Sequence, residues 1–354
     1  MLLQEVHVKT ALKVIGGLLL VVVVLVGGTL AWAFSAADAK RVPHRFDDIH
    51  GKDLPVPWPL TQKEIDDLRA EKLAAMTMPA QGEQLPGTEP PPDPLAGVDL
   101  QAVAMERALA RGKHLIEARL ACTDCHGKDF AGSTVVDVPI MGRFVCPNIT
   151  QGGTTKGWKP ADFDRIIRHG VGHDGRGILM PSRDFTMLSD QEVSDVIAVV
   201  TSMPPVEKVQ PPIKLGPIYA LLMATGKVPI DAENIDHAAP RLAEPPAAVV
   251  GAEFGAHLTQ VCVGCHKADF AGGPITGGDP SWPPARNLTQ DPTGLKDWTL
   301  DDFRRALREG KRKDGTDLNP VMPWAMTKNM TDDEIASIWE YLKTVPPKPW
   351  PTKG

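Results

Sequence analysis

Four of the five cysteines fall into two copies of one short pattern, and this pattern constrains the fold more than any other feature of the chain. The copies are Cys122-Thr-Asp-Cys125-His126 and Cys262-Val-Gly-Cys265-His266. C-x-x-C-H is the attachment pattern of c-type haem. Two thiols on one helical turn can bond to the two vinyl groups of the porphyrin, and the adjacent histidine then lies under the iron. We therefore expect two covalently bound haem c groups, with His126 and His266 as iron ligands.

Other uses of a C-x-x-C pair fit less well. A redox pair has no need of the following histidine and lies near a βαβ pattern, which this sequence lacks. A four-cysteine zinc site would have to join two pairs that lie far apart in the chain. The fold is thus expected to be held by cofactors and not by disulfides.

The chain also repeats itself at a shift of about 140 residues. The haem motif recurs together with the Asp-Phe-Ala-Gly that follows it, and Trp158 recurs as Trp298. Ser189-x-x-Glu192 and Thr331-x-x-Glu334 are both capping boxes, in which two side chains satisfy free backbone N–H groups at a helix start. A proline pair follows each of these helices. The sequence therefore predicts two tandem modules of one design.

Each module is expected to be helical. One helix leads into the haem motif (99–121 and 250–261), a second begins at Pro160 or Thr299, and the capped helix is the third. The Gly- and Pro-rich stretches between Phe130 and Trp158, and between Phe270 and Trp298, predict loops with little strand. Only 5% of the residues are aromatic, and a large flat cofactor in each module would take the place of core aromatics.

The segment Val14–Phe34 carries no charge and is long enough to cross a bilayer at about 1.5 Å per residue. A cleavable signal peptide is the alternative, with small residues such as Ser35-Ala36-Ala37 near its end. The apolar run exceeds the roughly 7 to 15 residues usual in a signal peptide, which favours a retained anchor. Because c-type haem is attached outside the bacterial inner membrane, we expect a single-pass inner-membrane protein with its modules in the periplasm.

The predicted fold class is therefore mainly α: a transmembrane helix followed by two helical domains with long Gly/Pro-rich loops. A short helix is expected at 61–75 in the stalk, and the apolar run Ile218–Met223 of the connector is expected to pack between the modules. The expected parts are a transmembrane anchor (1–37), a Pro-rich periplasmic stalk (38–98) with its richest stretch at 86–94, a first domain (99–205), a connector (206–249) and a second domain (250–348).

The modules resemble class I cytochrome c domains. The tandem layout is similar to that of membrane-bound cytochromes c related to the cytochrome subunits of bacterial alcohol dehydrogenases, which typically carry three haem motifs where this chain has two. The resemblance spans about 100–205 and 250–348. Besides the haem motifs, it rests on Pro147-Asn148-Ile149-Thr150, Gly157-Trp158, Met180-Pro181, Asn287-Leu288-Thr289, Asp297-Trp298 and Met322-Pro323.

The resemblance implies that Met180 and Met322 are the second axial ligands of the two irons. Each is followed by proline and precedes the capped helix. Core packing is the usual role of a methionine, and three others lie nearby: Met187, Met326 and Met330. The first two lack a repeat partner, and Met330 aligns with a leucine.

The resemblance also implies that Trp158 and Trp298 donate their indole N–H to a haem propionate, the alternative being a core aromatic. Asn148 and Asn287 are expected to hold the same loop. His169 and His173 are expected to be exposed residues near a helix end.

Cys146 is the one cysteine outside the motifs. A cysteine thiolate can ligate haem iron, but the repeat places Ala285 opposite Cys146. We therefore expect a small buried residue there.

These features predict an electron-transfer protein and not an enzyme, since the sequence shows no catalytic constellation. The expected function is the relay of single electrons between partners such as a quinol-oxidising complex, a dehydrogenase or a terminal oxidase. The alternatives are a cytochrome subunit of a membrane dehydrogenase and, less favoured, a dihaem peroxidase or thiosulfate dehydrogenase. The net charge of −6 argues against nucleic acid as a partner.

Overall fold

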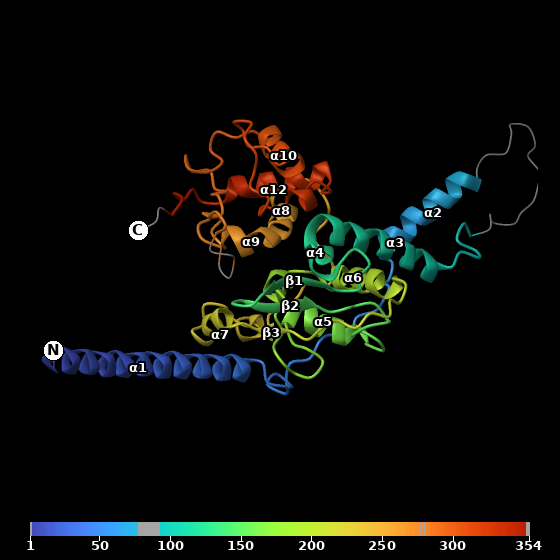
Figure 1. Ribbon diagram of the computed structural model, residues 1–354. Coiled ribbons are helices and arrows are strands. Elements are labelled where there is room, and N and C mark those ends of the chain that lie inside the picture. Colours follow the sequence, from blue (N-terminus) through green and yellow to red (C-terminus); the bar gives the residue numbers. More distant parts are fainter. Residues whose placement is uncertain (1, 77–92, 276–277, 279–280, 352–354) are drawn as a thin grey trace, which may run out of the picture.

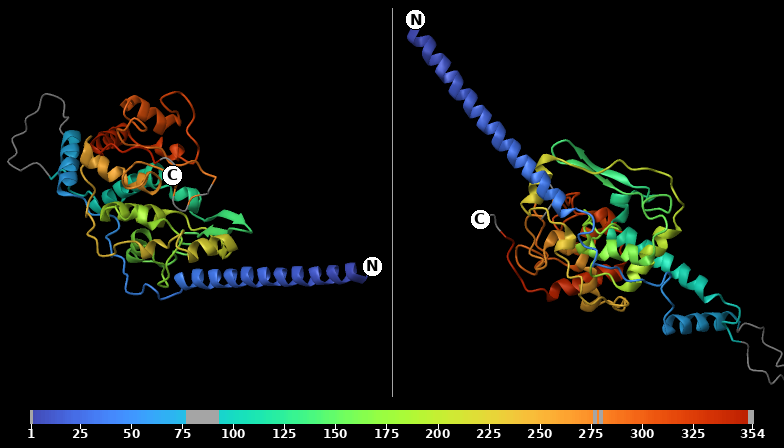
Figure 2. Two further views of the ribbon diagram at one scale, coloured as in Figure 1. Left: turned by 90° about the vertical axis from the view of Figure 1, so that its left-hand side faces the viewer. Right: turned by 90° about the horizontal axis from the view of Figure 1, so that it is seen from below.

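The uncharged N-terminal run lies within one long helix, α1 (Leu2–Lys40), which extends away from the rest of the molecule (Figures 1 and 2). The computed structural model describes residues 2–76, 93–275, 278 and 281–351. Its segment Lys13–Lys40 is long and apolar enough to cross a membrane. Apolar side chains from Val14 to Val26 are exposed on this helix, as expected of a surface that meets lipid.

The first module is built on two crossing helices, α3 (Leu100–Leu115) and α6 (Asp190–Ser202). A Cβ on Gly112 would collide with the backbone carbonyl of Asp195, so glycine allows the two helices to approach closely. A π turn, η1 (Ile116–Leu120), leads from α3 to the haem motif. The other helices of the module are α4 (Cys122–His126), α5 (Pro160–His169) and η2 (Ser182–Phe185).

The second module repeats this arrangement with α8 (Ala252–Leu258) crossing α12 (Asp332–Thr344). Gly255 occupies the crossing, since a Cβ there would collide with the carbonyl of Ser337. The repeat therefore extends to a glycine at the helix crossing of each module. The other helices are α9 (Gln260–His266), α10 (Leu300–Glu309) and α11 (Trp324–Thr327).

Both capping boxes are confirmed. The backbone N–H of Glu192 donates to Ser189 Oγ at 3.2 Å, and that of Glu334 donates to Thr331 Oγ1 at 3.1 Å. Each carboxylate accepts in return from the backbone N–H of its serine or threonine. Both helices end just before their proline pair.

The expectation of loops after Phe130 is wrong in the first module. Strands β1 (Ser133–Val138) and β2 (Gly142–Cys146) form an antiparallel hairpin, and β3 (Lys214–Leu215) of the connector pairs with β2. Valines in β1 and β2 favour strand, and Gly142 takes a positive φ of 112° after the turn. In the second module the described residues show an isolated bridge, Gly273 to Ala285, at this place.

The expectation that Ile218–Met223 packs between the modules is also wrong. This run forms α7 (Pro217–Ala224), which packs against α1. A short turn, η3 (Asp231–Glu233), follows it in the connector.

Part of the expected stalk contacts the first module. Leu54 is buried in the core of that module, and the backbone N–H of Lys52 donates to Asp164 Oδ2 at 2.7 Å. The expected short helix is present as α2 (Gln62–Met76). Most of the Pro-rich stretch, residues 86–92, lies outside the described residues.

Candidate haem sites

In the second module the haem motif opens onto a cavity of about 480 Å³. Helix α9 places Cys262, Cys265 and His266 in its wall, and Trp298 and Met322 reach the same cavity from later segments. The volume lies within the range of about 300 to 1,000 Å³ usual for ligand sites. Thiols, an imidazole and a thioether in a mostly apolar wall fit a covalently bound haem.

Each motif histidine is oriented by a backbone carbonyl. Nδ1 of His126 lies 3.0 Å from the carbonyl oxygen of Pro147, and Nδ1 of His266 lies 2.7 Å from that of Arg286. A carbonyl only accepts, so Nδ1 carries the proton and Nε2 is left free to bind iron. Burial lowers the pKa of both imidazoles, against a smaller opposing effect of the carbonyl, which favours the neutral form that ligates metal.

Asn148 and Asn287 hold the loop that supplies these carbonyls. The side-chain amide of Asn148 donates to the carbonyl of Val206 at 2.7 Å, and that of Asn287 donates to the carbonyl of Lys348 at 2.7 Å. Each side-chain oxygen accepts from the backbone N–H two residues later. The two asparagines thus tie the loop after the haem motif to the segment after the last helix of the module.

Trp158 and Trp298 pack against the cores of their modules. The ring of Trp158 meets Phe163 edge-on, with centroids 5.4 Å apart, and stacks on His173 with centroids 6.0 Å apart. Trp298 lines the cavity of the second module.

The four candidate methionines other than Met180 differ in their surroundings. Met187 is 45% exposed, whereas Met330 is 2% exposed and packs in the hydrophobic core. All three of Met322, Met326 and Met330 line the cavity, and the first two are half-buried. In the first module Met180 is half-buried just before η2.

The expectation for His169 is wrong. This side chain is buried, with its Nδ1 2.9 Å from Nδ1 of His237. His237 belongs to the connector, which folds back over α5 and covers the helix end. His173 is exposed, as expected, and pairs with Asp162 at 3.2 Å.

Cys146 is half-buried and its thiol contacts the thiol of Cys125. Cys125 precedes His126, and the residue after Cys146 supplies the carbonyl that binds His126. Cys146 therefore lies on the His126 side of the site, which does not suit a ligand opposite that histidine.

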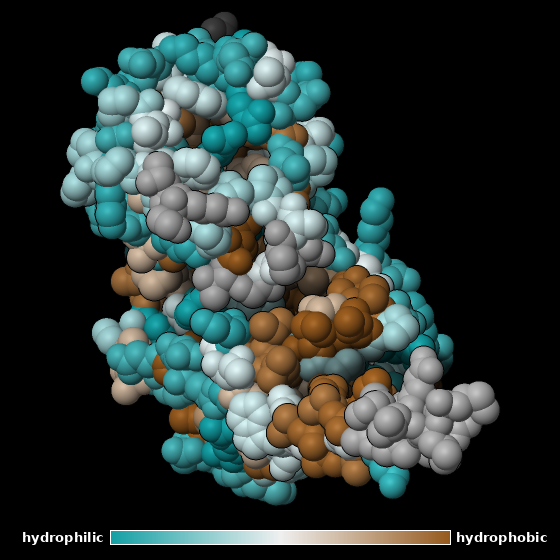
Figure 3. Space-filling model, turned by 60° about the vertical axis from the view of Figure 1, so that its left-hand side comes forward, coloured by the Kyte–Doolittle hydropathy of each residue, from teal (hydrophilic) through white to brown (hydrophobic). Residues whose placement is uncertain are grey.

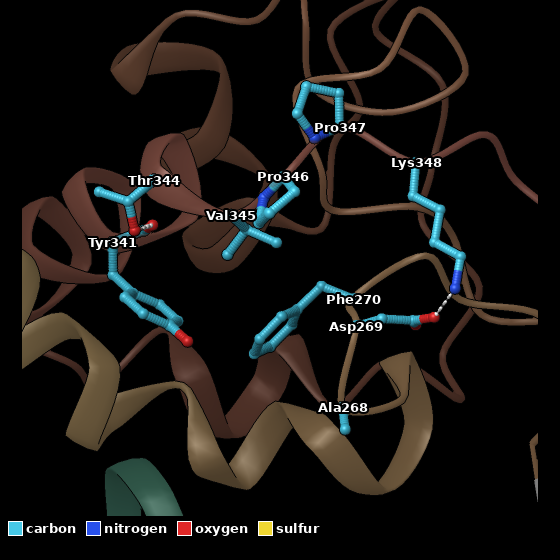
Figure 4. Close-up of a pocket in the computed structure, with 9 residues that line it drawn as sticks. All are labelled: Ala268, Asp269, Phe270, Tyr341, Thr344, Val345, Pro346, Pro347 and Lys348. Atoms are coloured by element: carbon cyan, nitrogen blue, oxygen red, sulfur yellow. Dashed lines mark hydrogen bonds and ion pairs between the residues drawn. The ribbon is translucent and has the colours of Figure 1, made fainter.

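A second cavity, of about 330 Å³, lies beneath the end of α12 (Figure 4). The rings of Phe270 and Tyr341 meet edge to face in its wall, with centroids 5.9 Å apart, and Lys348 pairs with Asp269 at its rim. Its wall holds no thiol, imidazole or thioether, so it is separate from the haem-attachment chemistry.

The two modules contact one another close to their haem motifs. Helix η2, just after Met180, packs against α9, and α11, just after Met322, packs against η1. Ala118 of η1 is buried in the core of the second module, and Val261 of α9 packs against the core of the first. The segment after Met180 or Met322 thus contacts the other module, next to that other module's haem motif.

A buried charge cluster joins the modules close by. Glu192 Oε1 accepts from Arg119 Nη1 at 2.9 Å, and His257 Nε2 of the second module lies 2.9 Å from both oxygens of Glu192. All three side chains are buried. Burial alone would raise the pKa of Glu192, but the His257 hydrogen bond and the Arg119 charge outweigh it and lower the pKa to about 2. Sequence reasoning recognised Glu192 only as a capping residue.

The second capping glutamate makes a corresponding contact in the other direction. Nε2 of His114, in the first module, lies 2.9 Å from Glu334 Oε2. The hydrogen bond to Glu334, against a smaller effect of burial, raises the pKa of His114. Each capping glutamate thus binds a histidine on the first helix of the other module.

Two family models match the chain. Residues 252–346 match the model of cytochrome c, and residues 107–198 match that of subunit III of cbb3-type cytochrome c oxidase. Each match covers one of the two modules and its C-x-x-C-H motif.

The chain is also similar to curated cytochrome c subunits. The cytochrome c subunit of the quinone alcohol dehydrogenase of Gluconacetobacter polyoxogenes is 30% identical to this chain over 266 residues. The aligned residues cover 66% of this chain and 54% of the relative. The corresponding subunit of Komagataeibacter europaeus gives the same values. The gluconate 2-dehydrogenase cytochrome c subunit of Pantoea cypripedii is 35% identical over 87 residues, 23% of this chain and 20% of the relative. The chain spans about half the length of the first two relatives. Each of the two tandem modules therefore matches a cytochrome c-type family model, and the chain is similar to the cytochrome c subunits of bacterial alcohol dehydrogenases.

Proposed function

We propose that the chain is a membrane-anchored dihaem cytochrome c that relays single electrons between redox partners. α1 is the anchor in the bacterial inner membrane, and the two domains lie in the periplasm. The observation that carries this proposal is the contact of each post-methionine segment with the haem-attachment region of the other module. Because electron tunnelling slows steeply with distance, a relay within one chain needs adjoining sites.

Four thiols and four ligands are assigned to the two haems. Each haem supplies one-electron chemistry through its iron when bound. Cys122 and Cys125 hold the first and Cys262 and Cys265 the second, while the carbonyls of Pro147 and Arg286 keep the ligand histidines in one tautomer. His126 with Met180 would ligate the iron of the first haem, and His266 with Met322 that of the second. Trp158 and Trp298 would donate their indole N–H to a haem propionate, and Asn148 and Asn287 hold the loop.

A rigid site suits this role, because a ligand set that changes little between oxidation states keeps electron transfer fast. The buried loop around Asn287 is held by hydrogen bonds from both sides of its side chain. The matching loop at Asn148 is held in the same way.

The partner that the relatives favour is a membrane dehydrogenase. The relatives' names place them in alcohol and gluconate dehydrogenases, so we propose that this chain is the cytochrome subunit of, or the electron acceptor for, an enzyme of that class. A quinol-oxidising complex or a terminal oxidase would be the other terminus of the relay. Affinity purification of the full chain in mild detergent tests this, since a dehydrogenase should co-elute and reduce the haems on addition of its substrate.

The haem count and ligands have direct tests. The intact mass should exceed that of the mature chain by two haems, and the double variant Cys262→Ala/Cys265→Ala should lose one of them. Met322→Ala should remove the thioether-to-iron charge-transfer band of one ferric haem. Met326→Ala, which alters the same cavity, is the matched control and should keep the band.

The opposite result, loss of the band in Met326→Ala alone, would assign the ligand to Met326. Peroxide or thiosulfate turnover by the purified chain, with a suitable electron mediator, would contradict the relay and favour the enzyme alternatives.

A further inference from the structure

The β1–β2 hairpin and residues 214–224 of the connector pack together beside α1. We call residues 133–146 and 214–224 the platform. The backbone N–H of Gly216 donates to the carbonyl of Met141 at 2.9 Å, and that of Ile218 donates to the carbonyl of Ile140 at 3.1 Å. A Cβ on Gly216 would collide with the backbone of the hairpin turn. The hairpin turn and α7 are therefore fixed to one another.

The platform is joined to α1 by close packing of small and flexible side chains. Ala33 and Ala37 of α1 are fully buried, as are Ala220 and Met223 of α7. Small residues at a helix interface let the two backbones approach closely. Figure 2 shows α7 and the hairpin beside the C-terminal end of α1.

This contact lies at the level where α1 would leave the membrane. A hydrocarbon core needs about 20 residues of helix, so a span that begins at Val14 reaches its outer edge near Ala33. Trp32, which is 52% exposed, is of the residue type that gathers at the membrane–water interface. α7 packs on Ala33 and Ala37 and therefore lies at the same level.

The platform presents an apolar face around this contact. Val138, Ile140 and Ile218 are 47%, 52% and 41% exposed, and α7 carries no charged residue. A helix that is apolar all round is usually buried or in a membrane. Figure 3 shows apolar residues gathered on the lower part of the molecule, whereas the upper part is mostly hydrophilic.

The charges near this face suit an anionic bilayer. Lys214 and Lys227 are exposed on either side of α7 in the sequence, where they can meet lipid phosphates. The carboxylate of Asp137, in the hairpin, is compensated by Arg143 at 3.0 Å.

We propose that the platform is a second membrane-binding surface, which inserts the hairpin turn and the outer face of α7 into the headgroup region of the periplasmic leaflet. The inference rests on the anchor role proposed for α1. A lipid surface is the favoured occupant because the apolar face is continuous with the spanning helix and lies at the depth of Trp32. One spanning helix leaves a domain free to tilt and rotate, and a second contact fixes the orientation of the first module over the membrane.

Site-specific fluorescence in the full-length holoprotein tests this. In a Cys146→Ala background, which copies Ala285 of the repeat, single cysteines are introduced by Ile140→Cys or Ile218→Cys and labelled with an environment-sensitive dye. The protein is placed in vesicles of phosphatidylcholine and phosphatidylglycerol. Quenching by a lipid with a doxyl group near its headgroup is compared with quenching by aqueous iodide. Leu20→Cys reports on α1, and Val249→Cys, 70% exposed in the connector, is the control outside the platform.

We expect the labels at Ile140 and Ile218 to be quenched by the doxyl lipid at least about twofold more than the label at Val249, and to be protected from iodide. Labels at both positions that behave like the label at Val249 would overturn the inference. Protection from both quenchers would also overturn it, since a protein would then cover the platform. An unquenched label at Leu20 would refute the anchor itself, whereas quenching at Leu20 alone would refute only the platform.

Discussion

Glu192→Gln should destabilise the protein far more than the matched change in the second module. Glutamine keeps the shape of the side chain and its capping capacity, but removes the negative charge between Arg119 and His257. The Arg119 side chain is 5% exposed and would keep its charge without a carboxylate partner.

The magnitude follows from the pKa of Glu192, which its contacts lower from 4.5 to about 2. At 1.36 kcal/mol per pKa unit, this corresponds to about 3 kcal/mol of stability at neutral pH. Leaving one partner of a buried ion pair unmatched costs about 3 to 5 kcal/mol, in agreement. Because the folded-state pKa is lowered, this stability is present above pH 4.5 and is lost as the pH falls toward about 2.

The assay is urea unfolding of the detergent-solubilised holoprotein, followed by circular dichroism and haem absorbance. The control is Glu334→Gln, since its partner His114 is 35% exposed and an ion pair of this kind is worth about 1 kcal/mol or less. Both variants change a capping glutamate at the same helix position, so the difference between them isolates the buried cluster. Equal losses in the two variants, or a loss of less than about 1 kcal/mol for Glu192→Gln, would refute this reasoning.

Three further outcomes follow from the structure. Gly255→Ala should lower the free energy of unfolding by about 1 to 3 kcal/mol because its Cβ would overpack the α8–α12 crossing. The control is Gly251→Ala, whose Cβ would meet only one atom, at 3.9 Å, and which should change the free energy of unfolding little. Similar urea midpoints for the two variants would contradict the role of the crossing. His114→Gln should lower the free energy of unfolding below about pH 6.5, and should lower it progressively less as the pH rises through the raised pKa of His114. A loss of stability that is independent of pH from about 6 to 9 would exclude the His114–Glu334 pair as its cause. Asn287→Ala should lower stability by about 1 to 3 kcal/mol, because the buried backbone N–H of Thr289 loses its acceptor and the carbonyl of Lys348 loses one of its two donors. An unchanged unfolding curve would show that the loop is held by other contacts.

Much of the local structure was predictable because local rules decide it. The capping boxes, the helix ends before proline pairs and the short helix α2 depend on residues a few positions apart. The hairpin was missed although valines occupy β1 and β2. Glycines and prolines around it made the whole stretch resemble a loop, and the pairing with β3 of the connector has no local signal.

Contacts between distant segments were not predictable. No pattern in the chain indicated that His237 covers His169, or that Leu54 of the expected stalk enters the core of the first module. Such contacts depend on how complete modules and connectors pack, which the periodicity of one segment does not encode.

The sequence by itself determined the chemistry of each site: two pairs of thiols, a histidine beside each, and two modules of one design. It could do so because haem attachment is covalent and needs a fixed local spacing. Only the tertiary structure decided that a backbone carbonyl sets the tautomer of each ligand histidine. It also decided that η2 packs on α9 and α11 on η1, which brings each module against the region of the other module's haem motif, and that α7 of the connector lies along α1. These contacts join residues far apart in the chain, and their energies exist only once the modules have packed.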